Sequence, residues 1–202
     1  RLVRLEPREP AHHIGLGEHL WESGDKKGAE RAWRRLVKLG RGAGGGHLLF
    51  AEVLADHGLD KEARSAFEAA LAAGPDNIAC LEAMARWLGS RRSHPDIVRS
   101  TRLWTRLLEL SYDPKAHPRA AARRSSARGN LVSTLERIGA VERRLGEISA
   151  RVKKNPTDLS AGLLLTELLL HLGRTKEARS ELDRLRAEAR GEKETIAAER
   201  QS

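Results

Sequence analysis

Aromatic residues make up only 3% of this 202-residue chain, and cysteine occurs once, as Cys80. An all-β domain relies on aromatic and β-branched residues, so the composition opposes that class. One cysteine excludes a disulfide within the chain and a cysteine-rich zinc site. The most apolar segment, 162–173, is too short to span a bilayer and contains Glu167 and His171. We therefore expect no membrane segment and no membrane partner.

The chain also lacks an initiator methionine, since it begins at Arg1. We expect it to be a piece of a longer protein, from which any signal peptide could have been lost. The absence of a disulfide framework is compatible with a reducing compartment. We therefore expect a cytoplasmic location.

No residue pattern indicates catalysis, a metal or a cofactor. Eight histidines are present, but they form no His-Glu-x-x-His sequence and no cysteine ligands accompany them. Segment 40–45 matches Gly-x-Gly-x-x-Gly, yet an amphipathic helix precedes it instead of the strand that a dinucleotide loop needs. We interpret it as a flexible loop, and Cys80 as a small packed residue. We therefore expect that the chain is not an enzyme and holds no metal and no cofactor.

Instead, the chain repeats itself with a period of 34 residues. Gly24 and Gly58 are 34 residues apart, as are Gly139 and Gly173, and the gap of 81 between the two pairs equals two periods plus 13. Apolar residues within each repeat recur at spacings of three and four, the stripe of an amphipathic helix. Such a period is typical of stacked antiparallel helix hairpins, so we predict an all-α fold, an α-solenoid.

Three kinds of residue should define each hairpin. Glycine after the first helix allows a left-handed cap, which we expect at Gly24, Gly58 and Gly173. Small residues should let the paired helices approach closely, and large apolar residues on the second helix should fill the space between repeats. The small positions are Gly17, Ala51 and Ala85, and the large ones are Trp33, Phe67 and Trp104.

The period divides the chain into five repeats, of which the third and fourth are degenerate. We expect a lead-in over residues 1–9, repeats one to three over 10–114, a basic insertion over 115–124, repeats four and five over 125–192, and a polar tail over 193–202. The insertion could fold as one helix or divide the stack into two halves, and the sequence leaves both open. Asp76 and Thr157 are candidates for N-caps or turn formers at the start of the third and fifth repeats.

The pattern resembles the tetratricopeptide repeat (TPR), in which Ala-x-x-x-Phe on the second helix precedes a proline. Ala63, Phe67 and Pro75 match it most closely, and the resemblance covers about 180 residues. It implies a right-handed superhelix with a concave groove lined by the first helices. It also implies a scaffold or adaptor, part of a larger protein or complex, that binds a peptide or helix of another protein.

The resemblance assigns groove positions to particular residues. Members that grip chaperone C-termini hold a terminal carboxylate with Lys, Asn and Arg, but the matching positions here, Ile14, Glu18, Leu49 and Ala83, cannot hold an anion. The groove should instead suit an amphipathic helix or an extended peptide with apolar anchors and basic flanks. The groove-binding candidates are Ile14, Glu18, Trp21, Leu48, Glu52 and Arg86.

A basic middle region supports an alternative. The net charge is +9, and residues 86–154 hold 17 Lys and Arg against 6 Asp and Glu. The anion-binding candidates, which would follow one helix face, are Arg119, Arg123, Arg124 and Arg128. The alternative function is binding of nucleic acid or an acidic partner through 86–154, although the arginines could instead form a solvated helix face. No aromatic residues are interleaved, which opposes single-stranded nucleic acid. The sequence leaves the oligomeric state open.

Overall fold

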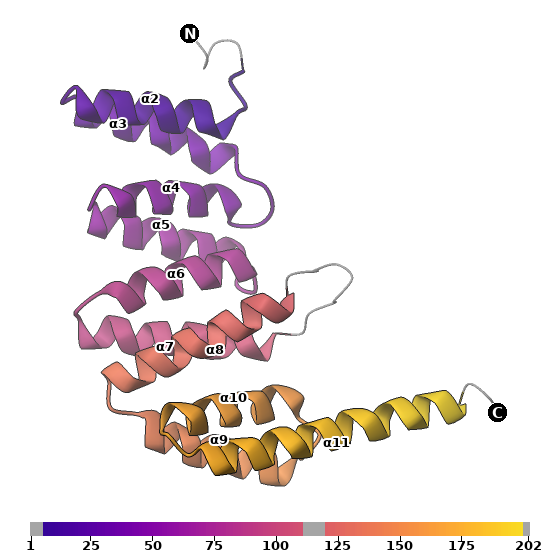
Figure 1. Cartoon of the computed structure of the whole chain (residues 1–202). Helices are drawn as coiled ribbons and strands as arrows, with labels where there is room; N and C mark the ends of the chain where they lie inside the picture. Colours follow the sequence, from indigo (N-terminus) through magenta and orange to yellow (C-terminus); the bar gives the residue numbers. More distant parts are fainter. Residues whose placement is uncertain (1–5, 111–119, 200–202) are drawn as a thin grey trace. The chain divides into compact units, whose positions relative to one another are not determined.

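The computed structural model describes residues 6–110 and 120–199, and within this part of the chain every regular element is a helix (Figure 1). The fold class is therefore all-α, as predicted. The helices are α2 (Pro10–Glu22), α3 (Lys26–Trp33), the 3-10 helix η1 (Arg34–Lys38), α4 (Gly45–Asp56), α5 (Asp60–Ala73), α6 (Ile78–Ser90), α7 (His94–Glu109), α8 (Ala120–Arg137), α9 (Val141–Lys154), α10 (Leu159–His171) and α11 (Thr175–Glu199).

The chain divides into two compact units, Arg1–Leu88 and Gly89–Ser202. In unit 1, α2 packs against α3 and α4 against α5 as antiparallel hairpins (Figure 1). The second helices contribute large side chains to the core, where Trp33 is fully buried and Phe67 is 2% exposed. Stacked hairpins of this kind are the building unit of an α-solenoid.

Glycines end the first helices as the sequence predicts. Gly24, Gly58 and Gly173 adopt positive φ angles of 90°, 69° and 72°, and Gly139 does so at 64°. At Gly58 the chain closes with backbone hydrogen bonds to the last turn of α4, from the Gly58 amide to Ala55 and from the Leu59 amide to Leu54. A left-handed residue allows this closure, and only glycine adopts it without a steric cost.

Small residues allow the close approach of paired helices. Gly17 on α2 lies against the Trp33 indole so closely that a Cβ at position 17 would overlap the ring. The Trp33 Nε1–H also donates a hydrogen bond to the Ile14 carbonyl at 3.3 Å. Ala51 and Ala85, at the equivalent positions, are fully buried. The predicted pairing of a small with a large residue is confirmed for Gly17 and Trp33.

The glycine-rich segment 40–45 forms the loop between η1 and the start of α4, as expected, and some of its glycines are closely packed. Gly44 has φ 82° and precedes the first turn of α4. A Cβ at this position would overlap the Ala70 carbonyl oxygen near the end of α5. Gly44 therefore permits close backbone contact between the start of α4 and the end of α5.

In unit 2, α7 packs against α8, and α10 packs against α9 and α11. Buried side chains such as Leu131 on α8 and Leu168 on α10 form its core. Helix α8 begins at Ala120, so it includes residues 120–124 of the expected insertion. The N-cap of α10 is Asp158, which accepts a hydrogen bond from the Ala161 amide, while the Thr157 hydroxyl bonds Asn155 within the preceding turn.

Candidate interaction surfaces

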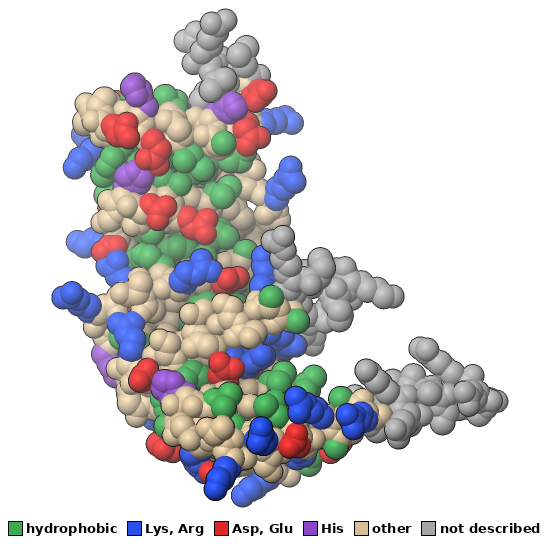
Figure 2. Space-filling view, viewed as in Figure 1, with side chains coloured by type: hydrophobic (Ala, Val, Ile, Leu, Met, Phe, Trp, Pro, Cys, Tyr) green, Lys and Arg blue, Asp and Glu red, His purple; other side chains and the backbone are tan. Residues whose placement is uncertain are grey.

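The predicted groove residues all lie on α2, α4 and α6, three helices of unit 1 that the sequence assigns as the first helices of their repeats. We call the surface of these helices within unit 1 the first-helix face. Figure 2 shows acidic side chains over α2 and α4 with apolar side chains between them. The α2, α4 and α6 helices contain five acidic residues and one Lys or Arg. The acidic residues are Glu18, Glu22, Glu52, Asp56 and Glu82, and the basic residue is Arg86.

The six groove-binding candidates differ in how much surface they offer. Glu52 and Arg86 are exposed, and Ile14, Glu18 and Trp21 are half-buried. Leu48 is only 9% exposed and belongs to the core of unit 1. Leu48 therefore supplies almost no surface to a partner, because its side chain is used for packing between helices.

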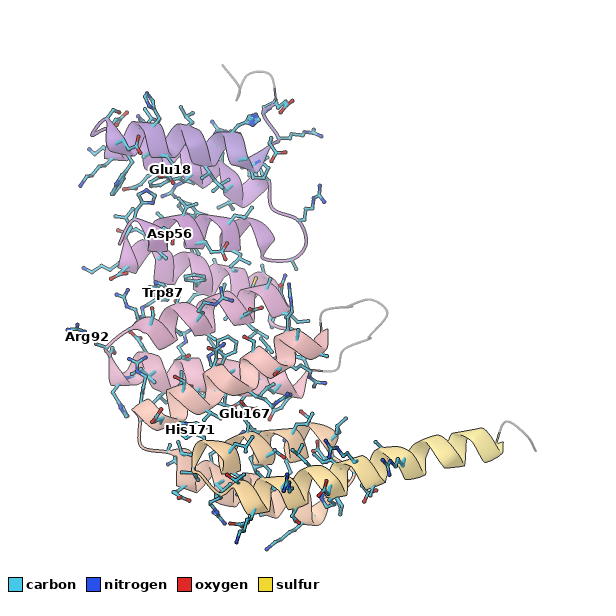
Figure 3. The ribbon with its side chains drawn as sticks, in the orientation of Figure 1. Glu18, Asp56, Trp87, Arg92, Glu167 and His171 are labelled. Atoms are coloured by element: carbon cyan, nitrogen blue, oxygen red, sulfur yellow. The ribbon has the colours of Figure 1, made fainter. Side chains whose placement is uncertain are left out.

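His57 brings two of the candidates together. Its Nε2 lies 3.0 Å from Glu18 Oε2, and its Nδ1 lies 2.8 Å from the Val53 carbonyl oxygen. The ring also packs edge-on against Trp21, with centroids 5.0 Å apart, and in a tilted arrangement against Trp33, with centroids 4.4 Å apart. In Figure 3 Glu18 projects from α2 towards α4. These contacts join repeats one and two at one end of the first-helix face.

Electrostatic interactions link α4 to α6 on the same face. Partial burial, followed by the nearby Asp56 carboxylate, raises the pKa of Glu52 above its ordinary value of 4.5, and Arg86 opposes this shift. Arg86 itself pairs with Glu82 one turn away at 2.6 Å. The face therefore holds closely spaced carboxylates that a single arginine only partly neutralises.

Cys80, on the inner side of α6, is fully buried. Burial, with a smaller contribution from Glu52, raises the pKa of its thiol. A buried thiol with a raised pKa is a poor nucleophile, which confirms the expected packing role.

The predicted anion-binding arginines have different roles in the structure. Arg124 donates hydrogen bonds to the carbonyls of Leu108 at 2.7 Å and Leu110 at 3.1 Å, and so caps the C-terminal end of α7. Arg128 is half-buried: burial lowers the pKa of its guanidinium, while Glu167 on α10 opposes the shift. Arg123 is exposed, and Arg119 lies outside the described residues. The structure therefore does not arrange the described three as one row of exposed cations.

Another arginine of α8 has a similar structural task. The Arg137 guanidinium donates to the backbone carbonyls of Gly89 and Arg91. Cations at helix C-termini interact favourably with the helix dipole. Part of the basic excess of unit 2 is thus explained by capping.

No cluster of three or more His, Cys, Asp or Glu side chains among the described residues could hold a metal ion. Within residues 6–110 and 120–199, no helix is both long enough and apolar enough to cross a bilayer.

Sequence reasoning missed the role of His57 and two hollows. One hollow of 630 Å³ lies where α3, η1, α4 and α5 meet, with Phe50 and Leu54 among its lining residues. Another, of 310 Å³, lies between α7 and α9 in unit 2. No single-sequence motif marks either hollow, because each is formed by helices from successive repeats.

No protein-family model matches the chain. No curated protein matches it either. It is similar to the solved structure described as a functional characterization of Pseudomonas aeruginosa pilF, with 17% identity, 89% of this chain and 76% of that chain covered, and a TM-score of 0.47. It is also similar to a solved mutant of MamA, with 13% identity, 88% and 96% covered, and a TM-score of 0.43. Both TM-scores are below 0.5, so neither similarity identifies what this chain binds.

Proposed function

We propose that this chain is a non-catalytic scaffold or adaptor, part of a larger protein or complex, whose first-helix face binds a peptide or helix of a partner protein. The observation that carries the proposal is the composition of that face, where half-buried apolar side chains lie beside carboxylates. Ile14 and Trp21 leave part of their surface in solvent, while Glu52 is exposed. An apolar anchor of a partner gains free energy by covering such surface.

The charges on the face indicate the chemistry of the partner. Residues 1–88 contain 13 Lys and Arg and 13 Asp and Glu, so unit 1 as a whole is neutral. Its first helices nevertheless carry mostly acids, and its basic residues concentrate on α3 and η1, at Lys26, Lys27, Arg31, Arg34, Arg35 and Lys38. A partner with basic residues flanking its apolar anchors would complement the first-helix face.

A capture experiment with matched charge-reversal variants tests the proposal. The full chain, Glu52→Lys and Glu68→Lys would each be incubated with native lysate at physiological salt, with and without nuclease. Glu52 is exposed on the first-helix face and Glu68 is exposed on the second helix α5, so both variants should fold. We expect a protein that the wild type and Glu68→Lys retain after nuclease treatment and that Glu52→Lys loses.

Two outcomes would contradict the proposal. Equal capture by both variants would show that the partner contacts another surface. Recovery of nucleic acid alone, lost at high salt and after nuclease, would favour binding through the basic region instead.

A further inference from the structure

Four arginines line the 310 Å³ cleft between α7 and α9, a site distinct from the first-helix face. Arg102 and Arg106 come from α7, and Arg143 and Arg144 come from α9. We infer that this cleft binds an acidic peptide segment of a partner protein, with carboxylates that pair with guanidinium groups on both helices. None of these four residues is among the anion-binding candidates expected from the sequence.

Three arginines of the cleft, Arg102, Arg143 and Arg144, have one carboxylate between them in the described part of the chain. Arg144 Nη1 lies 2.9 Å from one oxygen of Glu147, and Arg143 Nε lies 3.9 Å from the other, so two guanidinium groups share one carboxylate. Arg102 makes no ion pair within residues 6–110 and 120–199. The cleft therefore keeps a positive excess that an added carboxylate would neutralise.

Arg144 also supplies a donor that lacks an acceptor. Its Nε is buried and has no hydrogen-bond partner in the described part of the chain. Leaving a buried N–H without an acceptor is unfavourable, more so on a charged group. The threonines of the cleft do not compete for a ligand, because the hydroxyls of Thr101 and Thr105 already donate to the carbonyls of Ile97 and Thr101 at 2.9 Å. Arg102, Arg143 and Arg144 are therefore the donors to which an added anion can bind.

The spacing of the cations favours separate carboxylates. Arg102 and Arg106 are one helical turn apart, a rise of about 6 Å. Acidic residues at positions i and i+4 of a partner helix have the same separation, and carboxylates match the guanidinium fork in a bidentate geometry. A partner segment of this kind can pair one carboxylate with Arg102 and place the next beside Arg106, which already has an interaction within the chain.

Two features of the cleft oppose nucleic acid as its ligand. Glu109 and Glu147 also line it, and they would repel the closely spaced phosphates of a continuous polyanion. None of the residues that line the cleft is aromatic, so exposed bases would find no ring to stack on. The mixed charges suit an acidic peptide better than an oligonucleotide.

Fluorescence anisotropy with the full chain tests the inference. The probe is a short labelled peptide with glutamates at i and i+4, and its control is the same peptide with glutamine in their place, both at physiological salt. The double variant Arg102→Glu, Arg106→Glu reverses two exposed cations of the cleft. The matched control, Arg179→Glu with Arg190→Glu, reverses two exposed cations of α11.

We expect the glutamate peptide to bind about tenfold more tightly than the glutamine peptide, and the cleft reversal to abolish this difference. The α11 control should bind as the wild type does. Arg143→Gln, which removes one guanidinium without reversing charge, should weaken binding in the same direction but less. Circular dichroism melts of each variant would check that the variant is folded.

Three results would overturn the inference. Equal weakening by the α11 control would mean that only the net charge matters. Equal binding of the glutamate and glutamine peptides would show that the cleft does not recognise carboxylates. A single-stranded oligonucleotide that binds more tightly than the peptide, and is lost in the same cleft variant, would assign the cleft to nucleic acid.

Discussion

His57 Nε2 lies 3.0 Å from Glu18 Oε2, and this contact joins the end of α4 to the middle of α2. The Val53 carbonyl can only accept, so the proton on Nδ1 is directed at it. The His57 side chain is only 13% exposed and packs against two tryptophans, Trp21 and Trp33. His57 is therefore a structural link between the first two repeats.

Replacing His57 with alanine should destabilise unit 1. The variant loses the Glu18 contact and leaves a cavity beside Trp21 and Trp33, which we expect to lower the free energy of unfolding by roughly 2 kcal/mol. Urea denaturation followed by tryptophan fluorescence measures the change. His19→Ala, at an exposed site on α2, is the control and should stay within about 0.5 kcal/mol of wild type. Equal effects at both sites would contradict a special role for His57.

Gly17 and Gly15 provide a matched pair on one helix. A Cβ at Gly17 would overlap the Trp33 indole, so Gly17→Ala should cost about 1–3 kcal/mol by overpacking. A Cβ at Gly15 would meet nothing within 4 Å, so Gly15→Ala should raise stability by up to about 1 kcal/mol through helix propensity. Thermal melts of the two variants should therefore shift in opposite directions. A loss of stability at both positions would contradict the proposed packing.

The sequence predicted those parts of the fold that depend on local chemistry. The glycines at positions 24, 58 and 173 have positive φ because the left-handed cap that ends these helices needs that conformation, whatever the rest of the fold. Trp33 and Phe67 are buried because the helical stripe directs them inward. The 3-10 segment η1 was not predicted, since an apolar spacing of three and four does not distinguish a tightened last turn from an α-helix.

The sites were predictable only in part, because side-chain roles depend on distant partners. The spacing of Arg124 and Arg128 indicated one helix face, but it could not show that Arg124 reaches the end of α7. Glu18 is 39 residues from His57, and nothing local to either residue indicates the contact. The α7/α9 cleft likewise exists only once two hairpins have packed.

Asp158 should make unit 2 sensitive to acid. Burial alone would raise the pKa of Asp158, but hydrogen bonds from the Ala161 amide and from Arg151 outweigh it, and the pKa falls below its ordinary value of 3.8. The ionised Asp158 carboxylate therefore stabilises the folded state fully above pH 3.8, and this stabilisation is lost as the pH falls through the lower pKa of the folded state. Asp158→Asn keeps the cap but removes the charge, so its melting temperature should fall less steeply in acid than that of wild type.

Asp158→Ala should in addition lose about 1 kcal/mol at neutral pH, because it removes the N-cap of α10. Asp183→Asn is the control, since Asp183 belongs to an exposed pair with Arg186. Acid profiles of Asp158→Asn and wild type that run parallel would contradict the role of the charge.

Glu52 should have the opposite pH dependence. Its pKa is raised in the folded chain, so the stability linked to its protonated form is present below 4.5 and is lost as pH rises through the folded-state value. Glu52→Gln removes this penalty and should melt slightly above wild type at neutral pH, with the difference disappearing in acid. The effect should be small because Glu52 is exposed and solvent screens its interactions.

Glu22→Gln, at an exposed site at the end of α2, is the control and should melt without this difference between neutral and acid pH. A Glu52→Gln variant that is less stable than wild type at neutral pH would contradict the unfavourable crowding of carboxylates. If the first-helix face binds a basic segment, the same crowding favours the complex, because partner cations neutralise Glu52 and Asp56 together. Glu52→Gln should then gain stability alone and lose affinity for the partner, a combination that simple damage to the fold would not produce.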